Sequence, residues 1–170
     1  MFNREVVQLL IKPITLNERK LLSNLYDIYN EFKNTYYLRR LLSSLSIVSS
    51  CHITADLISC DLSDIEVAIA LERLINRGLV QKGNKGYYEI SHTFQYIFYL
   101  VEDKNYIAST IRSILKFFKS HIPDKKSFYM PHALSIYEFC KKIIFEQNKS
   151  DDLESLGILT LYIVQKYFIL

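Results

Sequence analysis

Residues 62–90, LSDIEVAIALERLINRGLVQKGNKGYYEI, contain the local signals that decide the fold. Ser63 precedes Glu66 by three residues. This is the spacing of a capping box, in which the hydroxyl and the carboxylate each accept a hydrogen bond from the other residue's backbone N–H. The sequence therefore predicts a helix that begins at Asp64.

An apolar stripe and a glycine define the rest of this helix. Apolar residues from Val67 to Leu74 recur at three- and four-residue spacing, which is typical of one buried face. Gly78 follows and supplies the left-handed conformation that commonly ends a helix. Two short strand-like runs, 79–82 and 87–90, then flank the turn-forming sequence GNKG. The predicted order is helix, glycine stop and hairpin.

This order resembles the second half of a winged helix-turn-helix. Upstream, residues 53–58 resemble the short first helix of that motif, with Thr54 as its cap and residues 59–62 as the turn. The resemblance implies a fold that is mostly α with a small β-hairpin, in which N- and C-terminal helical extensions flank a winged-helix core. The residues that match the familiar signature of the second helix are Ala70, Leu71, Leu74, Gly78, Leu79 and Val80.

The flanking sequence predicts helices on both sides of this core. Thr15 and Glu18 form a second capping box, which predicts a helix over 15–34, and apolar residues at helical spacing predict another over 36–49. After the hairpin, two to four more helices are expected, beginning with one long helix or with two that break near Asp103. We therefore expect an N-terminal helical extension over 1–34, a winged-helix domain over 35–92 and a C-terminal helical region over 93–170.

The last segment, 153–170, is apolar nearly all round, and a helix that is polar on no side must be buried. We therefore expect a homodimer formed by this segment and the helix over 15–34. The layout also resembles that of MarR-like regulators, whose flanking helices build a homodimer, although the longer wing with an Asp-x-Arg signature is missing here. The expected interface residues are Leu21, Leu25, Ile28, Leu156, Leu159, Ile163 and Tyr167.

Basic side chains in the predicted core favour double-stranded DNA as the partner. A winged helix lays the second helix of its motif in the major groove, and basic residues of its wing contact phosphate. This hypothesis makes the protein a transcriptional regulator that acts as a homodimer. The expected DNA-binding residues are Arg39, Arg40, Arg73, Asn76, Arg77, Lys82, Asn84 and Lys85.

The charge of the same region opposes that hypothesis. Between residues 51 and 78 five acidic side chains meet two arginines, and Ala68 and Ile69 stand where polar, base-reading residues are usual. Helix capping accounts for Glu66, but no local pattern accounts for Asp61 or Glu72. The alternative is a protein–protein interaction module of a transcription, replication or segregation complex, with the acidic helix over 64–77 facing its partner.

Composition and motifs exclude other classes of protein. The chain has 170 residues, of which 49% are hydrophobic and 23% charged, with a net charge of +3. No signal peptide or uncharged apolar run of about 18 residues occurs, so we expect a cytoplasmic protein with no membrane partner. Three cysteines and four histidines at no metal-ligand spacing predict free thiols and no metal. Without a phosphate-binding loop or nucleophile motif, we expect neither cofactor nor catalytic residues, and therefore no enzyme.

One further motif overlaps the expected core. Residues 111–118 resemble the sliding-clamp-binding peptide, with Ile114 and a pair of phenylalanines in place, but the leading Gln is absent. The same residues fall on a predicted amphipathic helix, and we favour packing in the core.

Overall fold

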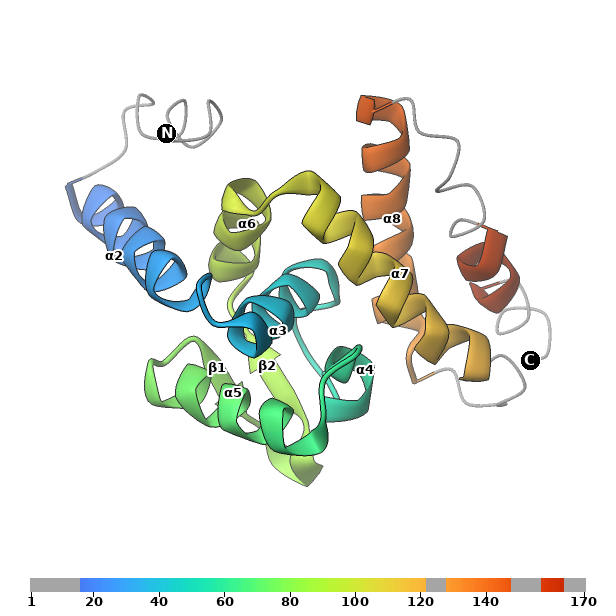
Figure 1. The fold of residues 1–170 in the computed structure, drawn as a ribbon, viewed down its shortest axis with the longest axis horizontal. Coiled ribbons are helices and arrows are strands. Elements are labelled where there is room, and N and C mark those ends of the chain that lie inside the picture. Colours follow the sequence, from blue (N-terminus) through green and yellow to red (C-terminus); the bar gives the residue numbers. More distant parts are fainter. Residues whose placement is uncertain (1–15, 122–127, 148–156, 164–170) are drawn as a thin grey trace.

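The computed structural model of the protein describes residues 16–121, 128–147 and 157–163. It is mostly helical, with one two-stranded antiparallel sheet (Figure 1), as the sequence predicts. A single 3-10 turn, Asn84–Gly86, joins strands β1 (Val80–Lys82) and β2 (Tyr88–Ile90). The helices are α2 (Leu16–Phe32), α3 (Tyr36–Ile47), α4 (Ala55–Ser59), α5 (Asp64–Asn76), α6 (His92–Val101), α7 (Lys104–His121) and α8 (Met130–Gln147).

Helix α3 lies at the centre of the fold, between α5 and α6 in Figure 1. It contacts α4, α5, α6, α7 and α8, and nine of its twelve residues are buried. Three of the buried residues are serines, and each makes a hydrogen bond inside the protein. For example, the Ser43 hydroxyl lies 2.9 Å from that of Thr110 on α7. Small polar side chains that are fully satisfied let neighbouring helices pack closely against α3.

The local signals around α5 act as the sequence predicts. The Ser63 hydroxyl accepts a hydrogen bond from the Glu66 N–H, and the Glu66 carboxylate accepts one from the Ser63 N–H at 2.9 Å. The helix begins at Asp64 and is followed by Gly78, which adopts a φ of +69°. The Thr54 hydroxyl caps α4 by accepting from the Leu57 N–H. Both expected helix starts are therefore confirmed.

The hairpin has a third partner that the sequence does not reveal. Val80 pairs with Ile90 and Lys82 with Tyr88, and the turn between the strands uses positive φ at Lys85 and Gly86. Ile53, just before α4, forms an antiparallel bridge to Tyr88. The segment between α3 and α4 is thereby attached to the edge of the hairpin.

The chain breaks once between α6 and α7, so the alternative with two helices is correct. The Asp103 carboxylate accepts a hydrogen bond from the Tyr106 N–H at 3.0 Å and caps the start of α7. Helix α8 carries Pro131 in its first turn, as expected. Residues 157–163 of the last segment are helical, and Leu159 and Tyr162 in them are fully buried. Residues 1–15, with Thr15 of the second capping box, and the rest of 153–170 lie outside the described residues.

His132 near the start of α8 is fully buried. Its Nε2 atom lies 3.2 Å from the backbone oxygen of His52, and its Nδ1 atom has no hydrogen-bond partner among the described residues. Burial lowers the pKa of His132 from 6.5 to about 4, because a charged imidazole is disfavoured away from water. The folded protein therefore holds this histidine neutral at physiological pH.

The capping box gives a first prediction. Replacing Ser63 with Ala removes the acceptor for one helix N–H, and the free energy of unfolding should fall by about 1 kcal/mol. Ser91 is a matched control, because it occupies the corresponding position before α6 without a side-chain cap bond. Chemical denaturation of both variants measures the difference. Equal losses for Ser63→Ala and Ser91→Ala would contradict this assignment.

Buried His132 gives a second prediction, on pH. Between pH 6.5 and about 4 the unfolded chain takes up a proton that the folded protein excludes, so stability falls as pH falls through this window. The dependence from this residue is at most about 1.4 kcal/mol for each pH unit. His132→Gln should flatten that part of the curve of unfolding free energy against pH. Parallel curves for the two proteins would show that His132 is not held neutral by burial.

Candidate functional site on helix α5 and the hairpin

Helix α5 buries one face and presents another apolar surface to solvent. Val67 and Leu74 pack into the core. On the exposed side, Ile65 is 72% exposed and Ile69 is 41% exposed, with exposed Ala68 between them in sequence. Single exposed hydrophobic residues are common, but isoleucines one helical turn apart form a continuous apolar surface. We call Ile65, Ala68 and Ile69 the α5 strip.

Acidic side chains border the α5 strip. Asp64 precedes Ile65, and Glu72 lies one turn beyond Ala68 and Ile69; both side chains are exposed. Arg73 is the basic residue of this part of α5, and its guanidinium carbon lies 5.9 Å from the centre of the Tyr37 ring. The surface that a winged helix would present to the major groove is therefore apolar and acidic.

Arg40, expected at the DNA backbone, lies inside the protein. Its residue exposure is 4%, and its Nη2 atom donates to the Asp61 carboxylate at 2.9 Å and to the Ser113 hydroxyl. Its Nη1 atom donates to the Thr110 hydroxyl at 3.0 Å. The guanidinium therefore links α3 to α7 and to the turn before α5, and it is not available to a phosphate.

Asp61 is the other half of this cluster, and its role was not predictable from the sequence. Its carboxylate also accepts hydrogen bonds from the Ser113 hydroxyl at 2.6 Å and from Lys116 Nζ at 3.0 Å. The bond from Ser113, followed by those from Lys116 and Arg40, lowers the pKa of Asp61 to about 2. We call Arg40, Asp61, Thr110, Ser113 and Lys116 the Arg40 cluster.

Arg39 is also held by the fold. Its Nη2 atom lies 2.6 Å from the carboxylate of Glu102, which is buried at the end of α6. Its guanidinium carbon lies 3.9 Å from the centre of the Tyr106 ring, a cation–π contact. The hydrogen bond to Glu102 raises the pKa of Arg39 further above its usual value. Together, Arg39 and Arg40 connect α3 to the end of α6 and to α7.

The remaining expected DNA contacts lie on the surface. Arg77 forms an ion pair with Glu31 at 2.7 Å. Both side chains are half exposed, so this ion pair contributes little stability. The other residues are exposed at the end of α5 and on the hairpin: Arg73, Asn76, Lys82, Asn84 and Lys85. These five side chains are on the surface, whereas Arg39 and Arg40 are held by ion pairs of the fold.

The expected dimer residues that the structure describes pack within the chain. Leu25 and Leu159 are buried, and Ile28 and Ile163 are partly buried against the same core. The side chain of Leu21 lies outside the described part of the chain, as do Leu156 and Tyr167. A second copy of the chain is therefore not needed to cover Leu25 or Leu159.

The clamp-like motif is part of the core. Ile114 and Phe118 are fully buried and Phe117 packs against the core, as the favoured interpretation predicted. Within residues 16–121, 128–147 and 157–163, no cluster of His, Cys, Asp and Glu side chains could hold a metal ion. Cys51, Cys60 and Cys140 are thiols outside any disulfide. No described helix is both long and apolar enough to cross a membrane.

Comparison with known proteins adds no further constraint. No family model, curated protein or solved structure matches the chain. The candidate site therefore stands on its own geometry.

The Arg40 cluster gives a third prediction. In an NMR titration the Asp61 carboxyl should have a pKa of about 2, and Ser113→Ala should raise this pKa because the hydrogen bond that lowers it most is lost. Ser120→Ala, an exposed serine on the same helix, is the control. Since the folded pKa lies below the usual 3.8, stability from this group is lost as pH falls from about 4 to about 2. An Asp61 midpoint near 4 in the unmodified protein would contradict the assignment.

Proposed function

We propose that residues 36–90 form a winged-helix module that docks a protein partner through the α5 strip. The order of elements supports the proposal: α3, the bridging residue Ile53, α4, α5 and the hairpin follow one another along the chain. The main observation behind the proposal is that Ile65 is 72% exposed. Covering a branched apolar side chain on the outer face of this helix with a partner would lower the free energy.

The chemistry of the surface favours protein over DNA. Interfaces with duplex DNA are strongly positive, and bases are read mainly by hydrogen bonds from polar side chains. The α5 strip offers no polar group for base edges, and Asp64 and Glu72 beside it would repel phosphate. The prediction of DNA from the sequence rested on the winged-helix resemblance and on eight expected contacts, and two of these, Arg39 and Arg40, are used inside the fold. The partner that fits is a segment with apolar side chains flanked by Lys or Arg.

Duplex DNA remains the second candidate function, favoured by a specific observation on the hairpin. Lys82 and Lys85 are exposed there with Asn84, and Arg73 and Asn76 are exposed near the end of α5. This group is suited to phosphate contacts. Under this alternative, the protein is the cytoplasmic, homodimeric transcriptional regulator that the sequence suggested.

A photo-reactive amino acid at position 65 tests the docking proposal. We expect cross-linking to one defined protein in extracts of the source cell, with no such product from position 93, an exposed residue on α6. With that protein purified, Ile65→Ser should weaken binding at least tenfold, because most binding energy is concentrated in a few buried apolar contacts. Thr93→Ser is the matched control. Unchanged affinity for Ile65→Ser would remove the α5 strip from the interface.

Salt-dependent binding to duplex DNA separates the two candidates. At about 50 mM salt, where electrostatic binding is strong, the docking proposal predicts no measurable retention of a duplex by fluorescence anisotropy. If the hairpin reads DNA, the protein binds instead. Lys82→Ala with Lys85→Ala should then lower the slope of log K against log salt by roughly one or two. That second result would replace the docking proposal with the DNA-binding one.

A further inference from the structure

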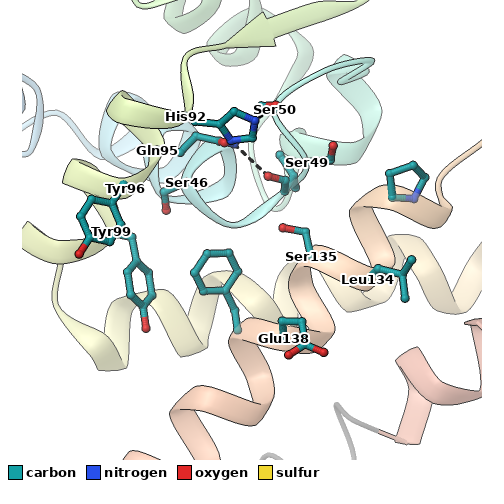
Figure 2. A pocket seen from close by; sticks show the side chains of 13 residues that line it. Ser46, Ser49, Ser50, His92, Gln95, Tyr96, Tyr99, Leu134, Ser135 and Glu138 are labelled. Atoms are coloured by element: carbon teal, nitrogen blue, oxygen red, sulfur yellow. Dashed lines mark hydrogen bonds between the residues drawn. The ribbon is translucent and has the colours of Figure 1, made fainter.

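A groove of about 500 Å³ lies away from the α5 strip, on the side of the molecule formed by α6 and α8. Figure 2 shows His92, Gln95, Tyr96 and Tyr99 of α6 along one wall and Leu134, Ser135 and Glu138 of α8 along the other. Ser46, at the end of α3, belongs to its floor. This volume lies within the range of pockets that hold small organic molecules.

Aromatic rings provide much of the apolar lining. Tyr99 and Phe139 close the space between α6 and α8, with ring centres 4.8 Å apart. Tyr96, 52% exposed, and Leu134, 39% exposed, lie on opposite walls with apolar surface still uncovered. The groove therefore offers stacking and apolar contacts to a flat ligand.

The end of α3 gives the floor a negative character. Backbone oxygens of Leu45 and Val48 point to Gln95, whose side-chain amide donates to both at 2.7 and 2.9 Å. Ser135 donates from the other wall to the Ile47 oxygen at 2.9 Å. The C-terminal end of a helix carries a partial negative charge, and the last turn of α3 contains no basic residue. The C-terminal end of α3, with its partial negative charge, therefore lies between the walls formed by α6 and α8.

The lining itself contains a carboxylate, and two lysines lie just outside it. Glu138 is the charged residue that lines the groove, and no Lys or Arg side chain of the described residues does so. Lys141, one turn along α8, forms an exposed ion pair with Glu138 at 2.9 Å and competes for its carboxylate. Lys104 Nζ lies 3.7 Å from the centre of the Tyr99 ring, so this ring already takes part in a cation–π contact.

We propose that the groove binds a small organic cation, an aryl-alkyl amine in its ammonium form. The aryl group packs among Tyr96, Phe139 and Leu134, and the ammonium lies between the end of α3 and Glu138. An anionic ligand would meet the Glu138 carboxylate and the end of α3, and among the described residues no Lys or Arg belongs to the lining itself. Ser50, on the groove, also accepts a backbone hydrogen bond from Ile90 at 2.9 Å, so a ligand here contacts the segment that anchors the hairpin.

Three indole compounds of similar size test the charge preference. Tryptamine is a cation, tryptophol is neutral and indole-3-propionate is an anion at pH 7.5. Titration of the full chain, followed by NMR chemical shifts, should give the order tryptamine, tryptophol, indole-3-propionate, with tryptamine about three- to fivefold tighter than tryptophol. Shifts should map to α6, α8 and the end of α3. Equal binding of the three compounds, or no tryptamine binding at millimolar concentration, overturns the proposal.

Variants with opposite expected signs test the assignment of Glu138. Glu138→Gln should weaken tryptamine about three- to fivefold and leave tryptophol unchanged, whereas Lys141→Ala frees the carboxylate and should tighten tryptamine. Tyr96→Ala removes apolar surface and should weaken both compounds. Glu89→Gln, an exposed carboxylate on the hairpin, is the matched control and should change neither. Equal tryptamine affinity in Glu138→Gln and Glu89→Gln overturns the proposed site, and none of these results depends on the protein-docking function of α5.

Discussion

The structure depends on how the charge of Arg40 is neutralised inside the protein. A buried guanidinium is costly unless a carboxylate and hydrogen-bond acceptors surround it. Asp61 supplies the carboxylate from the turn before α5, and Thr110 and Ser113 supply hydroxyl groups from α7. Removing Asp61 would leave the charge without its carboxylate, and removing either hydroxyl would leave the guanidinium with one acceptor fewer. The Arg40 cluster therefore fixes the central helix α3, the turn before α5 and helix α7 relative to one another.

This constraint also explains the character of the outer surface. Arg39 and Arg40 look like contacts for a phosphate backbone when they are read along the chain, but in the fold they neutralise Glu102 and Asp61. Asp61 looks like part of an acidic surface when the sequence is read along the chain, but in the fold its carboxylate is neutralised by Arg40. Ile65 and Ile69 then dominate the exposed face of α5, with carboxylates beside them. Such a surface is better suited to a protein than to DNA.

Local features were predictable from the sequence, and contacts across the fold were not. The Ser63–Glu66 capping box, Gly78 and Pro131 mark helix ends through neighbouring residues, and the structure agrees with each of them. Arg40, by contrast, is 21 residues from Asp61 and 73 from Ser113, and no pattern of spacing connects them. The groove between α6 and α8 was missed for the same reason, because its lining comes from residues 46–50, 92–99 and 131–139. A buried cation can be found only when the residues that surround it are known.

A double-mutant cycle on Arg40 and Asp61 tests this central role most directly. The free energy of unfolding is measured by chemical denaturation for the unmodified protein, Arg40→Met, Asp61→Asn and the double variant. If the two charges neutralise each other within the fold, the effects of the single variants do not add, and the coupling energy is about 1 to 3 kcal/mol. Additive losses, with a coupling energy near zero, would contradict the account and return Arg40 to the set of residues available for binding DNA.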